Sequence, residues 1–240
     1  MTPVLKMVLR MMGVIKDAFW NNVTLLMHMN GNNGGVIFTD EKGAISTVFG
    51  NAQTSTAASK WLGSSGKFDG TDDYLTLPSI AGYDFGTGDF TIDAWVRLEI
   101  TGVLYCICAY SKPTHDVLSD IAWFIYINAG ASARVQTTVV SGSTVYQADT
   151  VAGNIPINEW HFLRLIREGT IIKCALNGAR VSATTIGAAS INTPSTRLLK
   201  IGYRDTYYPA YLNGYMQDLR ITKGIARNIN EVPSARFPNE

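Results

Sequence analysis

The strongest constraint on the fold is an alternating stretch near the C-terminal end, residues 211–227. Asn213 and Gly214 are a turn signal, and after them the side chains alternate with the period of two that is typical of a β-strand, up to Gly224. The alternation places four residues on one face of this strand: Tyr215, Gln217, Leu219 and Ile221. A strand this late in the chain has to pair with strands formed much earlier, so the stretch predicts a closed β-sandwich of high contact order.

Other segments extend the all-β prediction to most of the chain. Residues 90–98 alternate clearly, with Phe90 and Ile92 on the apolar face and Asp93 on the more polar one. Residues 160–167 are apolar on both faces, which predicts a central strand in a covered sheet. Further strand signals follow the same pattern at 23–29, 36–40, 46–49, 66–68, 74–77, 103–110, 123–128, 134–140, 145–149, 171–176 and 198–203. Asn177-Gly178 predicts a type I′ hairpin turn, because both residues tolerate a positive φ.

The N-terminal segment has a different period. On a helix, apolar residues between Val4 and Phe19 form one stripe, and Lys6, Arg10 and Asp17 lie opposite it. We therefore predict an amphipathic helix over residues 1–20, followed by a single β-domain over residues 21–240. The helix either packs on its own sandwich or docks onto a partner subunit, and the sequence leaves both possibilities open.

Composition narrows the classes of function. Hydrophobic residues make up 46% of the 240 residues and charged residues 16%, so the chain can bury a large core. The net charge is +1 and no basic run occurs, so we expect neither nucleic-acid binding nor membrane insertion. The three cysteines Cys106, Cys108 and Cys174 are read as free buried thiols. We find no signal peptide and expect synthesis in a cytoplasm.

Several motifs together resemble the laminin-G-like, concanavalin A-like jelly-roll family. They are Phe68-Asp69-Gly70 with Asp73-Tyr74, the strand 90–96, the segment from Trp160-His161 to Asn177-Gly178, and residues 214–221. The resemblance covers residues 21–238 and implies an all-β, two-sheet antiparallel jelly-roll sandwich. Residues 23–31 and 221–227 are most similar to modules of bacteriophage structural proteins such as tail fibres, which build the particle or bind carbohydrate and are rarely enzymes.

The resemblance also implies a calcium site. Many members of the family hold a structural Ca²⁺, and Asn30, Asp40 and Asp218 stand where the family pattern places its oxygen ligands. The match is incomplete, because Asn30 replaces a more usual Asp and Glu41-Lys42 follows Asp40. The alternative is that these side chains make hydrogen bonds at turns and strand ends.

A tyrosine-rich loop is the candidate ligand-binding site. It contains six candidate residues: Tyr203, Arg204, Asp205, Tyr207, Tyr208 and Tyr211. Trp123 and Tyr126 are further candidate aromatic residues. Aromatic rings with a few polar groups suit a sugar, but tyrosines are equally enriched at protein interfaces, so both interpretations remain open.

The sequence contains no recognisable catalytic pattern. The Glu-x-Asp-x-Glu strand of concanavalin-like glycanases, with its paired carboxylates, is missing. His28, His115 and His161 have neither a nucleophile signature nor zinc-ligand spacing. His161 is best interpreted as an ordinary strand residue.

The sequence therefore predicts a non-enzymatic bacteriophage virion component, acting in particle assembly or host attachment. Expected partners are other virion proteins and further copies of the chain, and the expected location is the virion, after assembly in a bacterial cytoplasm. The alternative is an adhesion module that recognises a host-cell glycan.

Overall fold

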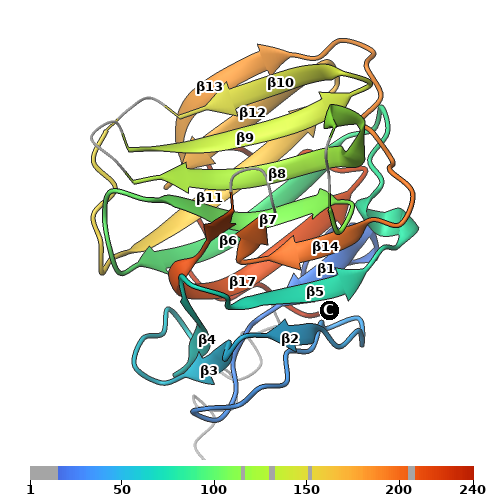
Figure 1. Ribbon diagram of the computed structural model, residues 1–240. Helices are drawn as coiled ribbons and strands as arrows, with labels where there is room; N and C mark the ends of the chain where they lie inside the picture. The colour runs from blue at the N-terminus through green and yellow to red at the C-terminus, as the bar shows by residue number, and fades with distance from the viewer. Residues whose placement is uncertain (1–15, 115–116, 130–132, 151–152, 205–208) are drawn as a thin grey trace, which may run out of the picture.

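The computed structural model describes residues 16–114, 117–129, 133–150, 153–204 and 209–240, except the side chains of residues 180–181. Within this part the chain forms a two-sheet antiparallel β-sandwich (Figure 1). The strands are β1 Val23–Met27, β2 Thr47–Phe49, β3 Gln53–Ser55, β4 Ser65–Asp69, β5 Tyr74–Pro78, β6 Phe90–Leu98, β7 Leu104–Ser111, β8 Ile121–Asn128, β9 Arg134–Ser141, β10 Thr144–Asp149, β11 Trp160–Glu168, β12 Ile171–Leu176, β13 Ala179–Thr185, β14 Leu198–Ile201, β15 Tyr203–Arg204, β16 Ala210–Tyr211 and β17 Asn213–Lys223. Three short 3-10 turns complete the elements: η1 Trp20–Asn22, η2 Ala81–Tyr83 and η3 Leu118–Asp120. The predicted all-β fold is confirmed.

The sandwich consists of a front sheet and a back sheet. The front sheet has the order β10-β9-β8-β7-β14-β5-β2 and faces the viewer in Figure 1. The back sheet has the order β13-β12-β11-β6-β17-β4-β3, with β1 also paired to β17. The main core lies between the sheets and includes Ile92, Tyr105, Trp123 and Leu219. The C-terminal segment covers part of the back sheet with Ile229 and Phe237.

The closing strand occupies the centre of the back sheet, and it pairs with strands formed early in the chain, as the sequence predicts. β17 pairs with β1, β4 and β6, which lie more than a hundred residues earlier in the chain. Two details differ from the prediction. Asn213 and Gly214 belong to the strand and form no turn, and a bulge between Gln217 and Arg220, with Asp218 at φ 53°, shifts the alternation. The residues that face the core are therefore Met216, Leu219 and Ile221. A strict period of two would instead place Tyr215 and Gln217 on the same face as Leu219 and Ile221.

Gly214 is required by its neighbours on β6. Its φ is +143°, and a Cβ atom at this position would lie 2.1 Å from the carbonyl oxygen of Arg97. A glycine that permits this close approach of two strands has the same sequence signature as a turn glycine, which explains the wrong turn prediction.

Other local predictions are confirmed with small changes at the ends. β6 has the predicted faces, and residues 161–167 of β11 are buried throughout. Asn177 and Gly178 have φ of 52° and 73°, as a type I′ turn requires. The predicted strand 36–40 is wrong, because this segment makes only one isolated bridge, between Thr39 and Ile45.

The predicted N-terminal helix lies mostly outside the described residues. Residues 16–19 are not helical, and the chain enters η1 at Trp20. Among the described residues, no helix is long and apolar enough to cross a membrane. The three cysteines are buried, as predicted.

Candidate functional site

The outer face of the front sheet carries a ladder of four aromatic rings, one from each of β2, β5, β15 and β16. Phe49 stacks on Tyr74 with ring centroids 4.2 Å apart, and Tyr74 lies 4.7 Å from Tyr203. Tyr203 stacks in turn on Tyr211 at 4.6 Å. We call these four residues the aromatic ladder.

Two of the three ring contacts follow from strand pairing, of β2 with β5 in the front sheet and of β15 with β16 in a separate two-stranded sheet. Neighbouring strands lie about 4.8 Å apart, and side chains stand roughly perpendicular to the sheet. Directly opposite residues, such as Phe49 with Tyr74 and Tyr203 with Tyr211, can therefore stack face to face. The faces between neighbouring rings are covered, so the inner rings of Tyr74 and Tyr203 present mainly their edges and phenol groups. Burial, and to a lesser extent Tyr211, raises the pKa of Tyr74.

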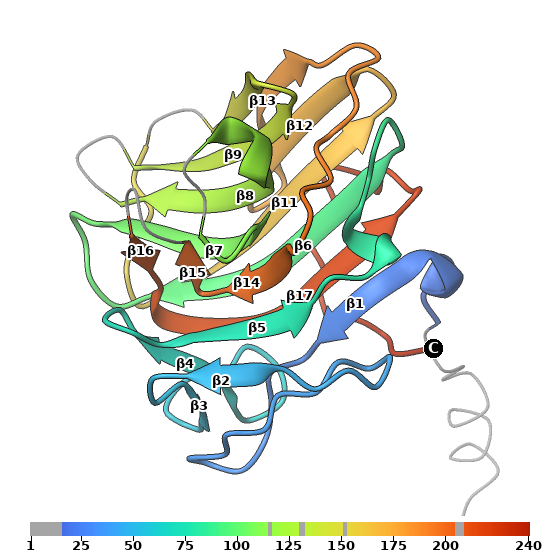
Figure 2. The ribbon, with the colours of Figure 1, turned by 45° about the vertical axis from the view of Figure 1, so that its right-hand side comes forward.

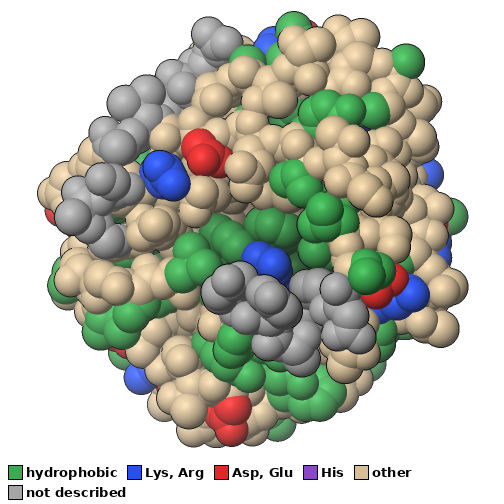
Figure 3. Space-filling view, turned by 45° about the horizontal axis from the view of Figure 1, so that its top comes forward, with side chains coloured by type: hydrophobic (Ala, Val, Ile, Leu, Met, Phe, Trp, Pro, Cys, Tyr) green, Lys and Arg blue, Asp and Glu red, His purple; other side chains and the backbone are tan. Residues whose placement is uncertain are grey.

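Beside the ladder, the hairpin of β15 and β16 covers an apolar part of the same face. The guanidinium of Arg204 lies over the rings of Phe124 and Tyr126, at 4.4 and 5.0 Å from their centroids, and Nη1 donates to the Tyr126 hydroxyl. Ala210 packs into the apolar cluster that these rings form on the outer face. Figure 3 shows a hollow with hydrophobic side chains and a basic group on this side of the molecule.

A pocket of about 260 Å³ lies at the end of the ladder. Tyr211 is part of both the ladder and the pocket wall. The loop between β6 and β7 contributes the half-exposed side chains of Ile100 and Val103, and Asn213 adds a polar group. An apolar wall with a few polar groups is typical of a site for a small organic ligand.

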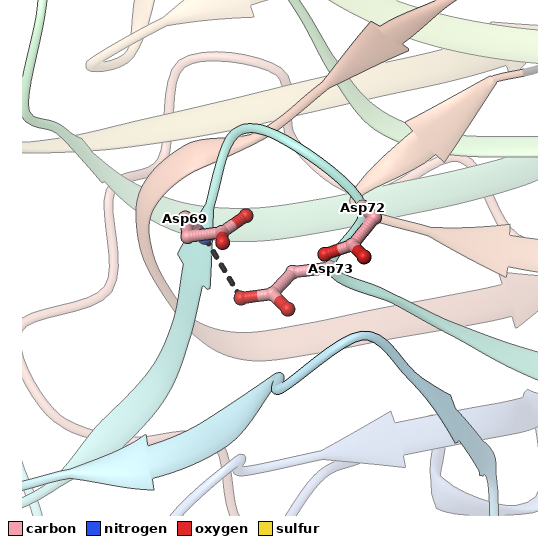
Figure 4. Close-up of side chains that lie close together, drawn as sticks. All are labelled: Asp69, Asp72 and Asp73. Atoms are coloured by element: carbon pink, nitrogen blue, oxygen red, sulfur yellow. Dashed lines mark hydrogen bonds between the residues drawn. The ribbon is translucent and has the colours of Figure 1, made fainter.

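Three carboxylates lie in the turn that precedes Tyr74. Single oxygens of Asp69, Asp72 and Asp73 lie within 4.8 Å of one another (Figure 4). Asp73 is buried, and its two oxygens accept the backbone N–H groups of Asn51 (2.6 Å) and Asp69 (2.9 Å). Burial raises the pKa of Asp73. The oxygen donors are of the kind that Ca²⁺ prefers, but Asp73 already has protein partners.

The three residues predicted to bind calcium are placed separately from this turn. Asn30 is exposed just after β1, whereas Asp40 and Asp218 are buried. Asp40 Oδ1 accepts the backbone N–H of Leu26 at 2.7 Å. Asp218 Oδ1 lies 2.5 Å from Nδ1 of the buried His28, and its Oδ2 accepts the N–H of Phe237. The hydrogen-bonding alternative thus accounts for both carboxylates, and calcium at these residues stays a prediction.

Part of the predicted tyrosine loop contributes to the aromatic ladder. The structure brings Tyr203 and Tyr211 together and places Arg204 beside them, whereas Asp205, Tyr207 and Tyr208 lie outside the described residues. Of the two further aromatic candidates, Tyr126 lies on the outer face and Trp123 in the core.

Sequence reasoning missed Phe49 and Tyr74. Both are in short segments whose pairing with the rest of the sheet is not visible in the sequence. The alternation in residues 74–77 carried a signal, because it places Tyr74 on the face opposite the core residues Leu75 and Leu77.

His161 has the structural role that was predicted. Its Nε2 lies 2.8 Å from the carbonyl oxygen of Pro156, and its Nδ1 lies 3.2 Å from Asn177 Nδ2.

A comparison with known protein families identifies the superfamily of this chain. The family model described as the concanavalin A-like lectin/glucanases superfamily (Laminin_G_3) matches residues 69–232, which is more than half of the chain. The chain belongs to this superfamily. The match agrees with the sandwich and with the resemblance drawn from the sequence. A search of curated proteins found no match.

Solved structures of the same fold include carbohydrate-associated and toxin domains. Domain 4 of AbnA, an extracellular arabinanase from Geobacillus stearothermophilus solved with arabinotriose, has a TM-score of 0.63 and 15% identity, over 87% of this chain and 96% of that one. The binding domain of Paraclostridial Mosquitocidal Protein 1 has a TM-score of 0.64 and 11% identity, over 88% and 52%. The binding domain of Botulinum neurotoxin DC, solved with SialylT, has a TM-score of 0.61 and 14% identity, over 89% and 51%. The chain thus spans about half of each toxin domain, and the likeness to all three is one of fold.

Proposed function

We propose that this protein is a non-enzymatic glycan-binding module whose binding surface is the aromatic ladder with its adjoining pocket. The observation that carries the proposal is the double position of Tyr211, which ends the ladder and lines the pocket of about 260 Å³. The fold is shared with domains whose structures were solved with arabinotriose and with SialylT, which supports the choice of a carbohydrate ligand.

The chemistry of the surface fits a sugar. Ile100 and Val103 offer apolar contact for the C–H groups of a pyranose or furanose ring. The phenol groups of the ladder, the amide of Asn213 and the exposed carboxylates of Asp69 and Asp72 can exchange hydrogen bonds with hydroxyl groups. Because the ladder rings already cover one another, we expect hydrogen bonding at the phenols and apolar contact mainly in the pocket.

A glycan array with the full chain tests the proposal. We expect selective binding, weakened about 10-fold or more in Tyr211→Ala, because central tyrosines dominate many binding surfaces. Tyr203→Phe removes only a hydroxyl and should have a smaller effect. Tyr146→Phe is the control, since Tyr146 packs against the core from β10, at the opposite edge of the front sheet. Failure of the wild-type protein to bind any glycan would reject the proposal.

A place in a bacteriophage particle is the second part of the proposal. It is supported by the similarity of residues 23–31 and 221–227 to phage structural modules. In that setting the module would attach the particle to a host glycan, and residues 1–20 would dock onto a neighbouring virion protein or a second copy. Light scattering on the full chain and on a variant lacking residues 1–15 tests the docking role. An oligomer that becomes a folded monomer supports it, and two equal monomers oppose it.

A further inference from the structure

A second pocket lies over the back sheet, far from the aromatic ladder in the fold. It has a volume of about 350 Å³ and is lined by residues 16–19, residues 231 and 233–238, and three arginines, Arg164, Arg220 and Arg227. Both ends of the described chain meet here, since the backbone N–H of Asp17 donates to the carbonyl oxygen of Glu240 (Figure 2). We call this the arginine pocket.

The arginines belong to a buried ionic network. Asp93 of β6 accepts from Arg164 Nε at 2.5 Å with one oxygen, and from Arg220 Nε and Nη2 at 3.0 and 2.5 Å with the other. Asp17 accepts from Arg220 Nη1 at 2.9 Å and from Arg227 Nη2 at 2.8 Å. The network therefore ties β6, β11 and β17 to the N-terminal segment.

The charges in this network do not balance. Three guanidinium groups face two carboxylates, and the arginine side chains are only 2%, 4% and 11% exposed for Arg164, Arg220 and Arg227. An uncompensated charge in such surroundings is unfavourable unless an ion of opposite sign is bound.

The charged groups around the network do not remove the excess. Arg236 adds a further positive charge to the pocket wall, and Glu231 adds an exposed carboxylate that makes no ion pair among the described residues. Lys16 already lies 3.8 Å from a Glu240 carboxylate oxygen. Residues 1–15 contain Lys6 and Arg10 but no acidic residue, so they offer no side-chain counter-charge.

The guanidinium groups of the network retain donor capacity. Arg164 Nη1 donates to the carbonyl oxygens of Asn228 and Glu231, and Arg227 Nε donates to Thr222 Oγ1. Within the described part of the chain, Arg164 Nη2 and Arg227 Nη1 have no acceptor.

The neighbouring rings hold these groups in place. The guanidinium of Arg164 lies 5.0 Å from the ring centroid of Phe162, and that of Arg227 lies 5.3 Å from that of Phe19. Donors fixed in this way lose little freedom when they bind a ligand.

We propose that the arginine pocket binds one oxyanion group, a carboxylate or a phosphate, held by Arg164 and Arg227 with Arg236 at the entrance. Guanidinium groups recognise such anions through paired, charge-assisted hydrogen bonds, and one bound anion balances the excess charge. The electrostatics agree, because burial and the charge of Arg220 lower the pKa of Arg227, and a bound anion would oppose that shift.

Calorimetric titration of the full chain with inorganic phosphate and with acetate, at an ionic strength fixed by chloride, tests the proposal. We expect saturable binding of at least one anion. Its affinity should be about 10-fold lower in Arg227→Gln, and the decrease should be smaller in Arg236→Gln. Binding of phosphate alone assigns a phosphate site, and binding of both anions assigns a carboxylate-compatible one. Arg97→Gln is the control, because it removes the same charge from β6 outside the pocket.

Two results would overturn the proposal. One is that neither anion binds beyond the effect of chloride, and the other is that the pocket variants bind as the wild type does. Arg227→Gln also removes a partner of Asp17 and could unfold the protein. In that case Arg236→Gln decides, since Arg236 is exposed and its replacement leaves the buried network intact.

Discussion

Replacing Asp93 by asparagine is the sharpest test of how the sandwich is held together. Asp93 is fully buried on β6 and accepts three hydrogen bonds from Arg164 and Arg220. Asparagine keeps the shape, but it removes the charge and points an amide donor at a guanidinium donor. Removing one partner of a buried ion pair lowers the free energy of unfolding by about 3–5 kcal/mol, because the remaining charges stay buried without their partner.

This loss is large for a protein of this kind. The free energy of unfolding of globular domains is about 5–15 kcal/mol, so Asp93→Asn should remove a substantial part of the total stability. For a chain of this length it corresponds to a fall in Tm of about 10 °C. Urea unfolding followed by tryptophan fluorescence measures the free energy, and calorimetry measures Tm. Asp72→Asn is the matched control, since Asp72 is exposed and makes no ion pair among the described residues, and it should stay within about 0.5 kcal/mol of the wild type. A loss below about 1 kcal/mol in Asp93→Asn would refute this account of the network.

Three further predictions follow from the same contacts. Burial raises the pKa of Asp93, but the charges of its arginine partners lower it by more, so the folded pKa lies below the unfolded one. The stability from this ionised group is complete above pH about 4 and decreases as the pH falls further, and urea titrations between pH 2 and 7 should show a smaller acid loss in Asp93→Asn. Gly214→Ala should cost more than about 3 kcal/mol or prevent folding, because its Cβ would clash with a β6 carbonyl oxygen, whereas Gly153→Ala meets open space and should be nearly neutral by thermal melting. Burial raises the pKa of the Cys174 thiol, so a thiol reagent should label it only after denaturant is added; rapid labelling of the native protein would contradict its burial.

Much of the fold could be predicted from local sequence. The alternation in residues 90–98, the two-sided apolar run at 160–167 and the Asn177-Gly178 turn each depend on a few neighbouring residues, and each is confirmed. The closing strand was predicted, but Tyr215 and Gln217 were assigned to the face of Leu219 and Ile221, whereas they lie on the opposite face. The bulge at Asp218 arises from pairing with β6, and a strict period of two cannot reveal it.

The candidate site could be predicted only in part. Tyr203 and Tyr211 are close in sequence and were predicted together, and the structure stacks their rings on one another, while their role in ligand binding stays a prediction. Tyr74 and Phe49 join them because β5 pairs with β2 and lies beside the hairpin, an arrangement that composition does not encode. The polar and apolar faces of single strands are visible in the sequence, whereas the neighbour across the sheet is not.

The sequence by itself determined the all-β class, the family resemblance, the near-neutral net charge and the position of most strands. These properties depend on composition and on contacts within a few residues. The tertiary structure alone decided the aromatic ladder and the arginine pocket. Arg220 meets Asp93 and Asp17 across separations of 127 and 203 residues, and such contacts are fixed only when the strands pair and the chain ends meet over the back sheet. Because that pairing is set by the packing of the whole core, no single stretch of residues specifies it.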